Sequence, residues 1–221
     1  MSKKLNLRYQ SVTIIGGAGF LLMDLEDCLT HGSTLISADG GANNLDKTKY
    51  KLDYIIGDFD SLSNENLRKN GEVKLIEIKE QETTDFEKCL YSVDAAAYFC
   101  VGFIGRRADH FLSVCSTLVK YHYKRVILVG AYDIIFHLPK TFEIELPLGT
   151  RLSLFPMRHI IGVSDSGLQW SIAGLEFEPS KKIGTSNATV KKMVNITLSN
   201  NGMLCIIPRS CFKHVIEAFR N

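Results

Sequence analysis

Four segments of the chain that read as β-strands each run into an acid, and these acids are the residues best suited to chemistry. Ligands of an open parallel α/β sheet bind beyond the carboxyl ends of its strands. Carboxylates gathered there would repel one another without a cation, and hard oxygen ligands suit a Mg²⁺ ion that carries phosphates. We therefore expect a Mg²⁺ and phosphate site at this edge. The segments are residues 35–38 before Asp39, 54–56 before Asp58 and Asp60, 73–78 towards Asp85, and 97–103 towards Asp109.

Glycines beside these acids leave the backbone open to a phosphate. Gly40 and Gly41 follow Asp39, and Gly57 precedes Asp58. Bare main-chain N–H groups at a helix start bind phosphate well. Each acid taken alone could instead be a solvated turn residue, since Asp and Gly dominate turns. Because such acids recur after successive strands, we favour the Mg²⁺ and phosphate site over isolated turn residues.

Helical patterns follow two of the strands and position the later acids. Thr84 and Glu87 fit a capping box, and apolar residues from Phe86 to Val93 recur on one helical face. Asp85 and Lys88 are predicted to lie off that buried stripe. A second helix is predicted to begin near Asp109, which would be its N-cap.

Composition limits the function classes. The chain has 221 residues, a formal net charge of +2 and no long Lys/Arg run, so nucleic acid and anionic membranes are not expected partners. Its six cysteines show no C-x-x-C pairing, which favours buried thiols over disulfides or a zinc site. No stretch resembles a signal peptide or a membrane span, so we expect a cytoplasmic protein.

The fold class predicted is α/β followed by all-β. Residues 12–130 alternate short β-branched runs with helical stretches, which indicates a mainly parallel sheet with flanking helices, Rossmann-like in type. Beyond Tyr132 short runs are broken by Pro and Gly, which is typical of an all-β module with hairpins. We assign residues 1–138 to the first domain and 139–221 to the second. Within the second, Asn201-Gly202 between two apolar runs predicts a hairpin, and a short helix is expected after Pro208.

Read in order, several segments resemble the signature segments of thiamin pyrophosphokinases. The resemblance extends over residues 12–207 and implies an α/β nucleotide-binding domain, a β-sandwich and a homodimer with the thiamin site at its interface. It implies Mg²⁺-dependent transfer of the pyrophosphoryl group of ATP to the hydroxyl of thiamin, with release of AMP. The segments are Ser37–Asn43, Gly57–Ser61, Thr84–Lys88, Arg107–His110, Ser153–Pro156, Gly167–Trp170 and Thr185–Asn187.

The same resemblance implies a role for each matching residue. It places the metal on Asp58, Asp60 and Asp85. The catalytic set it implies is Asp39, Asp58, Asp60, Asp85, Lys88, Arg107 and Asp109. Residues implied at ATP are Gly40, Gly41, Asn43, Gln81, Thr84 and His110. Residues implied at thiamin are Trp170, Ser186 and Asn187, with the indole stacked on the cationic ring.

Three positions depart from the family pattern. Arg106 stands where a glycine is usual, Val114 replaces a frequent polar residue, and Gln169 replaces a basic residue before the tryptophan. The sequence leaves open which acid, if any, accepts the hydroxyl proton. Two alternative functions also stay open: a pyrophosphokinase for another heterocyclic alcohol, and a noncatalytic nucleotide or thiamin sensor.

Overall fold

The computed structural model describes residues 7–46, 49–62, 73–105 and 107–220. Its contacts divide the chain into two units, Met1–Thr117 with Val126–Ala131, and Leu118–Arg125 with Tyr132–Asn221. β7 pairs with β14 and so belongs to the second unit. The domain boundary at residues 138 and 139 stays a prediction.

In the described part of the first unit, six strands follow one another in the order β6-β5-β1-β2-β3-β4. The pairings of β1 with β2 and β5, of β2 with β3, of β3 with β4 and of β5 with β6 are all parallel. The expected parallel sheet is therefore present. The strands are β1 (Leu7–Ile15), β2 (Thr34–Ala38), β3 (Tyr54–Gly57), β4 (Lys74–Glu77), β5 (Val93–Val101) and β6 (Val126–Val129).

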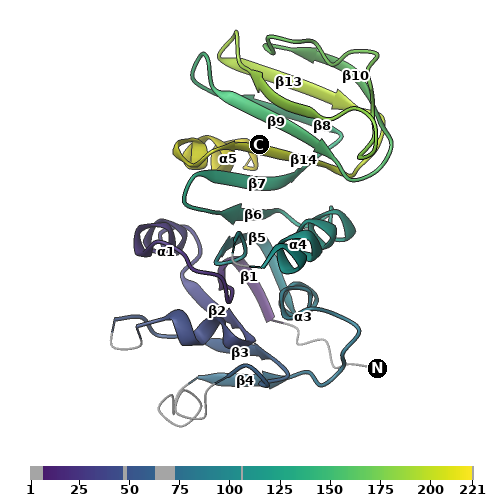
Figure 1. Cartoon of the computed structure of the whole chain (residues 1–221). Helices are drawn as coiled ribbons and strands as arrows, with labels where there is room; N and C mark the ends of the chain where they lie inside the picture. Colours follow the sequence, from purple (N-terminus) through teal and green to yellow (C-terminus); the bar gives the residue numbers. More distant parts are fainter. Residues whose placement is uncertain (1–6, 47–48, 63–72, 106, 221) are drawn as a thin grey trace. The chain divides into compact units, whose positions relative to one another are not determined.

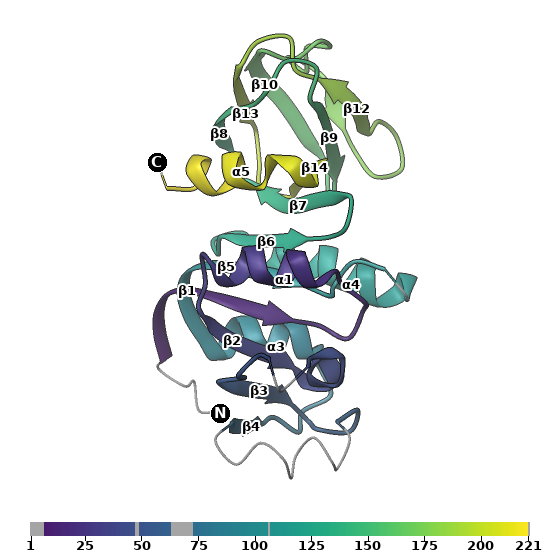
Figure 2. The same ribbon diagram turned by 90° about the vertical axis from the view of Figure 1, so that its left-hand side faces the viewer.

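Helices cover both faces of this sheet. α1 (Leu22–Leu29) lies on one face, and α3 (Asp85–Ser92) and α4 (Ala108–Lys120) lie on the other (Figures 1 and 2). The short 3-10 helix η1 (Asp39–Asn44) follows β2 directly. Fully buried β-branched residues of the central strands, such as Ile14 and Ile36, form the core between the layers. This core holds the carboxyl ends of the strands in fixed relative positions.

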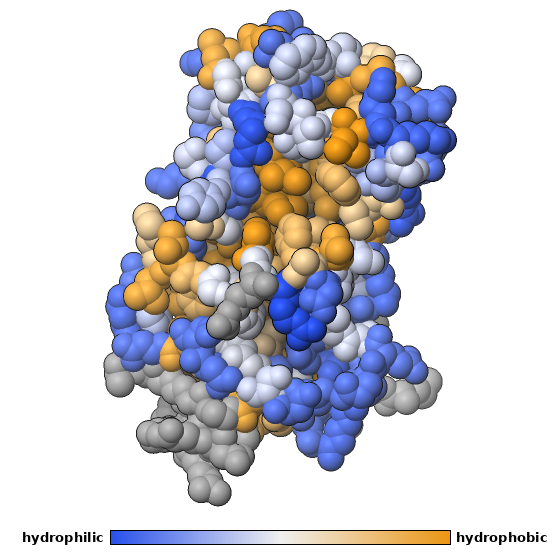
Figure 3. Space-filling view, viewed as in Figure 1, coloured by the Kyte–Doolittle hydropathy of each residue, from blue (hydrophilic) through white to orange (hydrophobic). Residues whose placement is uncertain are grey.

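Apolar side chains also reach the surface of the first unit at the start of α1 (Figure 3). Leu21, Leu22 and Met23 are 48%, 49% and 63% exposed, whereas Leu25 on the same helix is fully buried. The helix therefore uses only one face for the core. Among the described residues, no helix is both long enough and apolar enough to cross a membrane.

The second unit contains two antiparallel arrangements, β12-β9-β14-β7 and β11-β10-β13-β8. Phe136 on β7, Phe142 on β8 and Phe219 near the C-terminus contact one another, with ring centroids 5.4–5.5 Å apart. The strands are β7 (Asp133–Leu138), β8 (Thr141–Glu145), β9 (Arg151–Pro156), β10 (Ile160–Ser166), β11 (Glu176–Phe177), β12 (Gly184–Ala188), β13 (Met193–Leu198) and β14 (Met203–Pro208). The predicted short helix after Pro208 is present as η2 (Arg209–Cys211) and α5 (Phe212–Ala218).

The predicted hairpin at Asn201-Gly202 is wrong. β13 pairs with β8 and β10, whereas β14 pairs with β7 and β9, so the two strands lie in different sheets. A type I′ turn needs positive φ at both central residues, and here Gly202 has φ 115° while Asn201 is not in that region. The turn therefore carries the chain from one sheet to the other. All six cysteines are buried, and none of them forms a disulfide within the described residues, as predicted.

His137 makes the stability of the second unit depend on pH. Its Nε2 accepts a hydrogen bond from the Gly202 N–H at 2.9 Å, and the side chain is buried. Burial, with the nearby His122 and Arg158, lowers the pKa of His137 to about 4. The unfolded chain, with a histidine pKa near 6.5, then binds more protons between these values, so stability falls as the pH drops from about 6.5 towards 4.

We expect the titration of His137 alone to lower the free energy of unfolding by about 2 kcal/mol when the pH falls from 7 to 5. Urea melts at both pH values, followed by the fluorescence of the single Trp170 in this unit, measure the loss. His137→Gln keeps a side-chain acceptor but does not titrate, so its loss should be smaller by that amount. An equal loss in both proteins would contradict the prediction.

Candidate active site

A cavity of about 830 Å³ lies in the first unit at the carboxyl ends of its strands. Segments that follow four different strands line it: Gly16–Ala18 after β1, η1 after β2, the loop after β3, and Gly102 and Phe103 after β5. The starts of α3 and α4 complete the wall. This is the edge at which the sequence predicts the site.

Three of the predicted acids meet in this cavity. Carboxylate oxygens of Asp39, Asp58 and Asp60 all lie within 4.8 Å of one another. Asp39 is only 1% exposed, and its Oδ2 accepts a hydrogen bond from the Ser61 N–H at 3.1 Å. Its buried Oδ1 has no hydrogen-bond partner among the residues that the structure describes. Burial raises the pKa of Asp39, and the charges of Asp58 and Asp60 add to that effect. An unsatisfied buried oxygen beside two further carboxylates fits a divalent cation with oxygen ligands.

Backbone conformation brings these acids together. Phe59, between Asp58 and Asp60, has φ 66°, and Asp39 has φ 36°. Positive φ is uncommon for a residue other than glycine and costs of order 1–3 kcal/mol when the surrounding structure imposes it. The loop after β3 therefore curls, and Asp58 Oδ1 accepts a hydrogen bond from the Asp60 N–H at 3.3 Å.

Asp85, the third predicted metal ligand, lies beside this cluster with a different partner. Its Oδ1 is 3.2 Å from Nζ of Lys88, and that Nζ is also 3.4 Å from Oδ2 of Asp58. Burial raises the pKa of Asp85, although Lys88 opposes this. The structure thus groups Asp39 with Asp58 and Asp60, and Asp85 with Lys88.

The prediction that Lys88 lies off the buried helical stripe is wrong, because the residue is only 1% exposed. Burial alone would lower the pKa of Lys88, but its bonds to Asp85 and Asp58 outweigh burial and the net pKa is raised. The side chain is buried because its ammonium group has these two carboxylates as partners, which no helical periodicity reveals. It is a fixed positive charge beside Asp58 and Asp85.

The loop before α3 brings Gln81 and Thr84 to the cavity wall. Gln81 Nε2 donates to Asp58 Oδ2 at 2.7 Å, and this bond is the main cause of the lowered pKa of Asp58. Thr84 caps α3 by accepting a hydrogen bond from the Glu87 N–H at 3.3 Å, as the capping box predicts.

Glu80 organises that loop and was not among the predicted site residues. Its carboxylate accepts hydrogen bonds from the N–H groups of Glu82 and Thr83 at 2.8 and 3.0 Å, and from the Tyr91 hydroxyl at 2.9 Å. Partial burial raises the pKa of Glu80, but hydrogen bonds from the Thr83 side chain, the Tyr91 hydroxyl and these backbone N–H groups outweigh burial, and the net pKa is lowered. The sequence signal for this role is an acid shortly before a Thr-Thr pair. Acids often accept hydrogen bonds from the backbone N–H groups of the residues that follow them.

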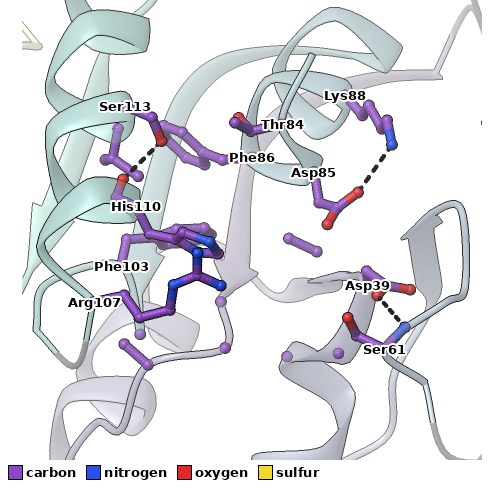
Figure 4. Close-up of a pocket in the computed structure, with 18 of the residues that line it drawn as sticks. Asp39, Ser61, Thr84, Asp85, Phe86, Lys88, Phe103, Arg107, His110 and Ser113 are labelled. Atoms are coloured by element: carbon purple, nitrogen blue, oxygen red, sulfur yellow. Dashed lines mark hydrogen bonds and ion pairs between the residues drawn. The ribbon is translucent and has the colours of Figure 1, made fainter. Parts of the chain in front are cut away.

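Basic groups face the acids across the cavity. Arg107 and His110, at the start of α4, line the side opposite Asp39 and Asp85 (Figure 4). Asp109 accepts hydrogen bonds from Arg107 Nε and Nη2 at 3.2 and 2.6 Å, which lower its pKa to about 2. Asp109 lies inside the first turn of α4 rather than at its N-cap, so that prediction is wrong. Arg106 lies outside the described residues.

Glycines at the strand ends serve packing as well as ligand access. Gly40, Gly41 and Asn43 line the cavity, as expected. A Cβ on Gly41 would lie 2.6 Å from the Ile15 carbonyl oxygen, and one on Gly57 would lie 2.6 Å from Cβ of Asp39. Gly57 therefore leaves the space that Asp39 occupies.

The three residues expected at thiamin all lie in the second unit. Trp170 is 58% exposed, so it is not a core residue of that unit. Ser186 is exposed with φ 61°. Asn187 is buried, and its amide is hydrogen-bonded to the backbone of Trp170 at 2.7 and 3.1 Å.

Comparison with known proteins agrees with this geometry. Residues 25–129 match the family model described as thiamin pyrophosphokinase, catalytic domain. Thiamine pyrophosphokinase 3 of Oryza sativa subsp. japonica is 26% identical over 202 residues, which cover 76% of each chain.

Solved structures share the fold. Thiamin pyrophosphokinase from Candida albicans superposes with a TM-score of 0.77 at 20% identity over 94% of both chains. Yeast thiamin pyrophosphokinase gives 0.78 at 18% identity over 98% of this chain and 94% of that one. The clustered acids Asp39, Asp58 and Asp60 all lie within the residues that match the catalytic-domain model. The part of the chain that carries this acid cluster is therefore similar to the catalytic domain of thiamin pyrophosphokinases.

Proposed function

We propose that this protein is a thiamine diphosphokinase, which transfers the pyrophosphoryl group of ATP to the hydroxyl of thiamin and releases AMP. The observation that carries the proposal is the acid cluster of Asp39, Asp58 and Asp60 facing Arg107 and His110 in one cavity. The acids can hold a cation, and the groups opposite them can bind anions. Together the two sets suit a polyphosphate that is bound with a metal ion. The family match supplies the identity of the acceptor.

The reaction needs no nucleophilic side chain, because thiamin brings its own hydroxyl. A bond forms between that oxygen and the β-phosphorus of ATP, and the bond from this phosphorus to the oxygen shared with the α-phosphorus breaks. The hydroxyl proton is transferred to a carboxylate or to water. The protein has to align the two reactants and to offset the phosphate charge.

Asp39, Asp58 and Asp60 would hold Mg²⁺, with Asp85 beside them, and the metal when bound would neutralise and orient phosphate oxygens. Gln81 holds Asp58 in place. Arg107 and His110 would bind phosphate oxygens from the other side, and Asp109 would keep the Arg107 guanidinium in position. Gly40, Gly41, Asn43 and Thr84 would offer backbone and side-chain donors.

We assign the nucleotide to a Rossmann-like first domain and thiamin to a β-sandwich second domain, with residues 138 and 139 as their boundary. A homodimer with thiamin bound at its interface is part of the same proposal. The six buried thiols, which form no disulfide within the described residues, support a reducing, cytoplasmic setting.

A mass-resolved product assay with purified protein, Mg²⁺, ATP and thiamin tests the function. Thiamin pyrophosphate formed together with an equal amount of AMP is the expected result. Thiamin monophosphate with ADP would overturn the reaction type. Binding of both substrates without any product would favour a sensor.

Trp170→Ala is expected to raise the KM for thiamin about tenfold and to leave the KM for ATP nearly unchanged. A half-exposed indole can stack on the cationic ring of thiamin, and a cation–π contact contributes about 0.5–2 kcal/mol. Steady-state kinetics with each substrate varied in turn measure both constants. Trp170→Phe, which retains a flat ring, is the matched control and should lie between the two. Unchanged thiamin kinetics in the alanine variant would rule out stacking.

A further inference from the structure

Both polar atoms of the Asn187 side chain are hydrogen-bonded within the protein. Its Nδ2 donates to the Trp170 carbonyl oxygen at 2.7 Å, and its Oδ1 accepts from the Trp170 N–H at 3.1 Å and from the Ala188 N–H at 2.9 Å. The residue is only 7% exposed. One buried amide thus binds both backbone polar groups of a tryptophan whose side chain is largely exposed.

The amide continues a short backbone ladder. The Val190 N–H donates to the Gly167 carbonyl and the Gln169 N–H donates to the Ala188 carbonyl, both at 2.8 Å. Beyond this point the strand turns away: Ser186 has φ 61°, its N–H donates to Ser153 Oγ at 2.9 Å, and the pairing of β12 with β9 is irregular there. The Asn187 side-chain amide therefore makes the hydrogen bonds to Trp170 that a backbone peptide group would make in a regular ladder.

The residues after Trp170 are tied down independently. Oδ2 of Asp165 accepts hydrogen bonds from Ser171 Oγ at 2.7 Å and from the N–H groups of Ile172 and Ala173 at 2.8 and 3.2 Å. Ile172 is 2% exposed and packs into the unit. Trp170 therefore lies between two anchored points of the chain, and its indole has only its own two χ angles left to vary.

We infer that Asn187 is a positioning residue that fixes the backbone of Trp170 and so holds an exposed indole ready for a flat ligand, rather than being a ligand of thiamin itself. A ring already held in place loses less conformational freedom when a ligand stacks on it, which strengthens binding. The consequence for thiamin rests on the proposed function, whereas the clamp on Trp170 stands without it.

Fluorescence of the ligand-free protein tests the clamp directly, because Trp170 is the single tryptophan of the chain. Asn187→Ala should add a fast component to the time-resolved anisotropy decay of Trp170, on the nanosecond timescale of loop motion. Asn187→Asp retains the acceptor but loses the Nδ2 donor, so it should give a smaller fast component. Anisotropy decays identical to wild type in both variants would overturn the inference.

Asn195→Ala is the matched control, since Asn195 is a half-buried asparagine of the same unit and bonds Ser166 instead. It should leave the decay unchanged. If circular dichroism shows that Asn187→Ala does not fold, the decay of Asn187→Asp decides the question: a fast component supports the clamp, and a decay like that of the wild type refutes it.

Kinetics then test the consequence for the substrate. The KM for thiamin should rise about tenfold in Asn187→Ala, with kcat and the KM for ATP changed less than about twofold, because only a pre-organised stacking contact is weakened. A fall in kcat with unchanged thiamin KM would overturn the positioning role. A wild-type protein that makes no thiamin pyrophosphate would refute the proposed function, and the anisotropy decays would then test the clamp by themselves.

Discussion

Asp60→Asn is expected to lower kcat by about 10²–10³-fold while the fold stays intact, since an essential charge in a preorganised phosphate site has an effect of that order. Asp60 is exposed, and its Oδ1 accepts a hydrogen bond from Ser61 Oγ at 2.8 Å that an asparagine oxygen can also accept. The substitution therefore removes one charge from the acid cluster and little else.

Two measurements separate that charge from stability. Melting temperatures without Mg²⁺ should agree within about 1 °C, whereas added Mg²⁺ should raise the melting temperature of the wild type more than that of the variant, because it binds the native cluster. Asp94→Asn, the same change at an exposed acid of β5, is the control and should retain full turnover. Normal turnover in Asp60→Asn would refute the assignment of the cluster to catalysis.

Lys88→Met is expected to lower the free energy of unfolding by about 3 kcal/mol, because it leaves Asp58 and Asp85 without the buried cation between them. Methionine fills a similar volume, so the lost charge rather than a cavity accounts for the effect. Urea melts followed by far-UV circular dichroism measure it. Saturating Mg²⁺ should recover part of the loss, since a divalent ion among the acids again offsets their repulsion.

The exposed pair of Lys79 and Glu77, 3.4 Å apart, provides the control for this effect. Lys79→Met should cost less than about 1 kcal/mol, as solvent screens such a pair. The double variant Lys88→Met with Asp85→Asn should be more stable than Lys88→Met alone. Equal losses of unfolding free energy in Lys88→Met and Lys79→Met would contradict the role of Lys88 as the cation that offsets Asp58 and Asp85. A difference between the two losses that Mg²⁺ does not change would also contradict it.

Local patterns predicted the elements of the first unit well. Strands ending just before Asp39 and Asp58 are present as β2 and β3, and the helix capped by Thr84 is α3. These predictions succeed because alternation, capping and turn residues act over a few neighbours in the chain. The parallel sheet then brings its carboxyl ends to one edge whatever the strand order.

Predictions that depended on distant partners succeeded less often. The Asn-Gly hairpin is wrong, because pairing of β13 and β14 with other strands decided the turn conformation. The place of Asn187 at thiamin stays a prediction, and the sequence did not show that the irregular end of β12 turns its amide towards Trp170.

The sequence by itself indicated the resemblance to thiamin pyrophosphokinases, the acids at the strand ends and the parallel sheet of the first unit. Only the tertiary structure decided which acids meet: Asp39 joins Asp58 and Asp60, whereas Asp85 pairs with a buried Lys88. The physical reason is that side-chain meetings across elements depend on strand order and on single backbone angles, such as φ 66° at Phe59, which residue spacing does not specify. Periodicity likewise could not show that the ammonium group of Lys88 has two carboxylates in reach.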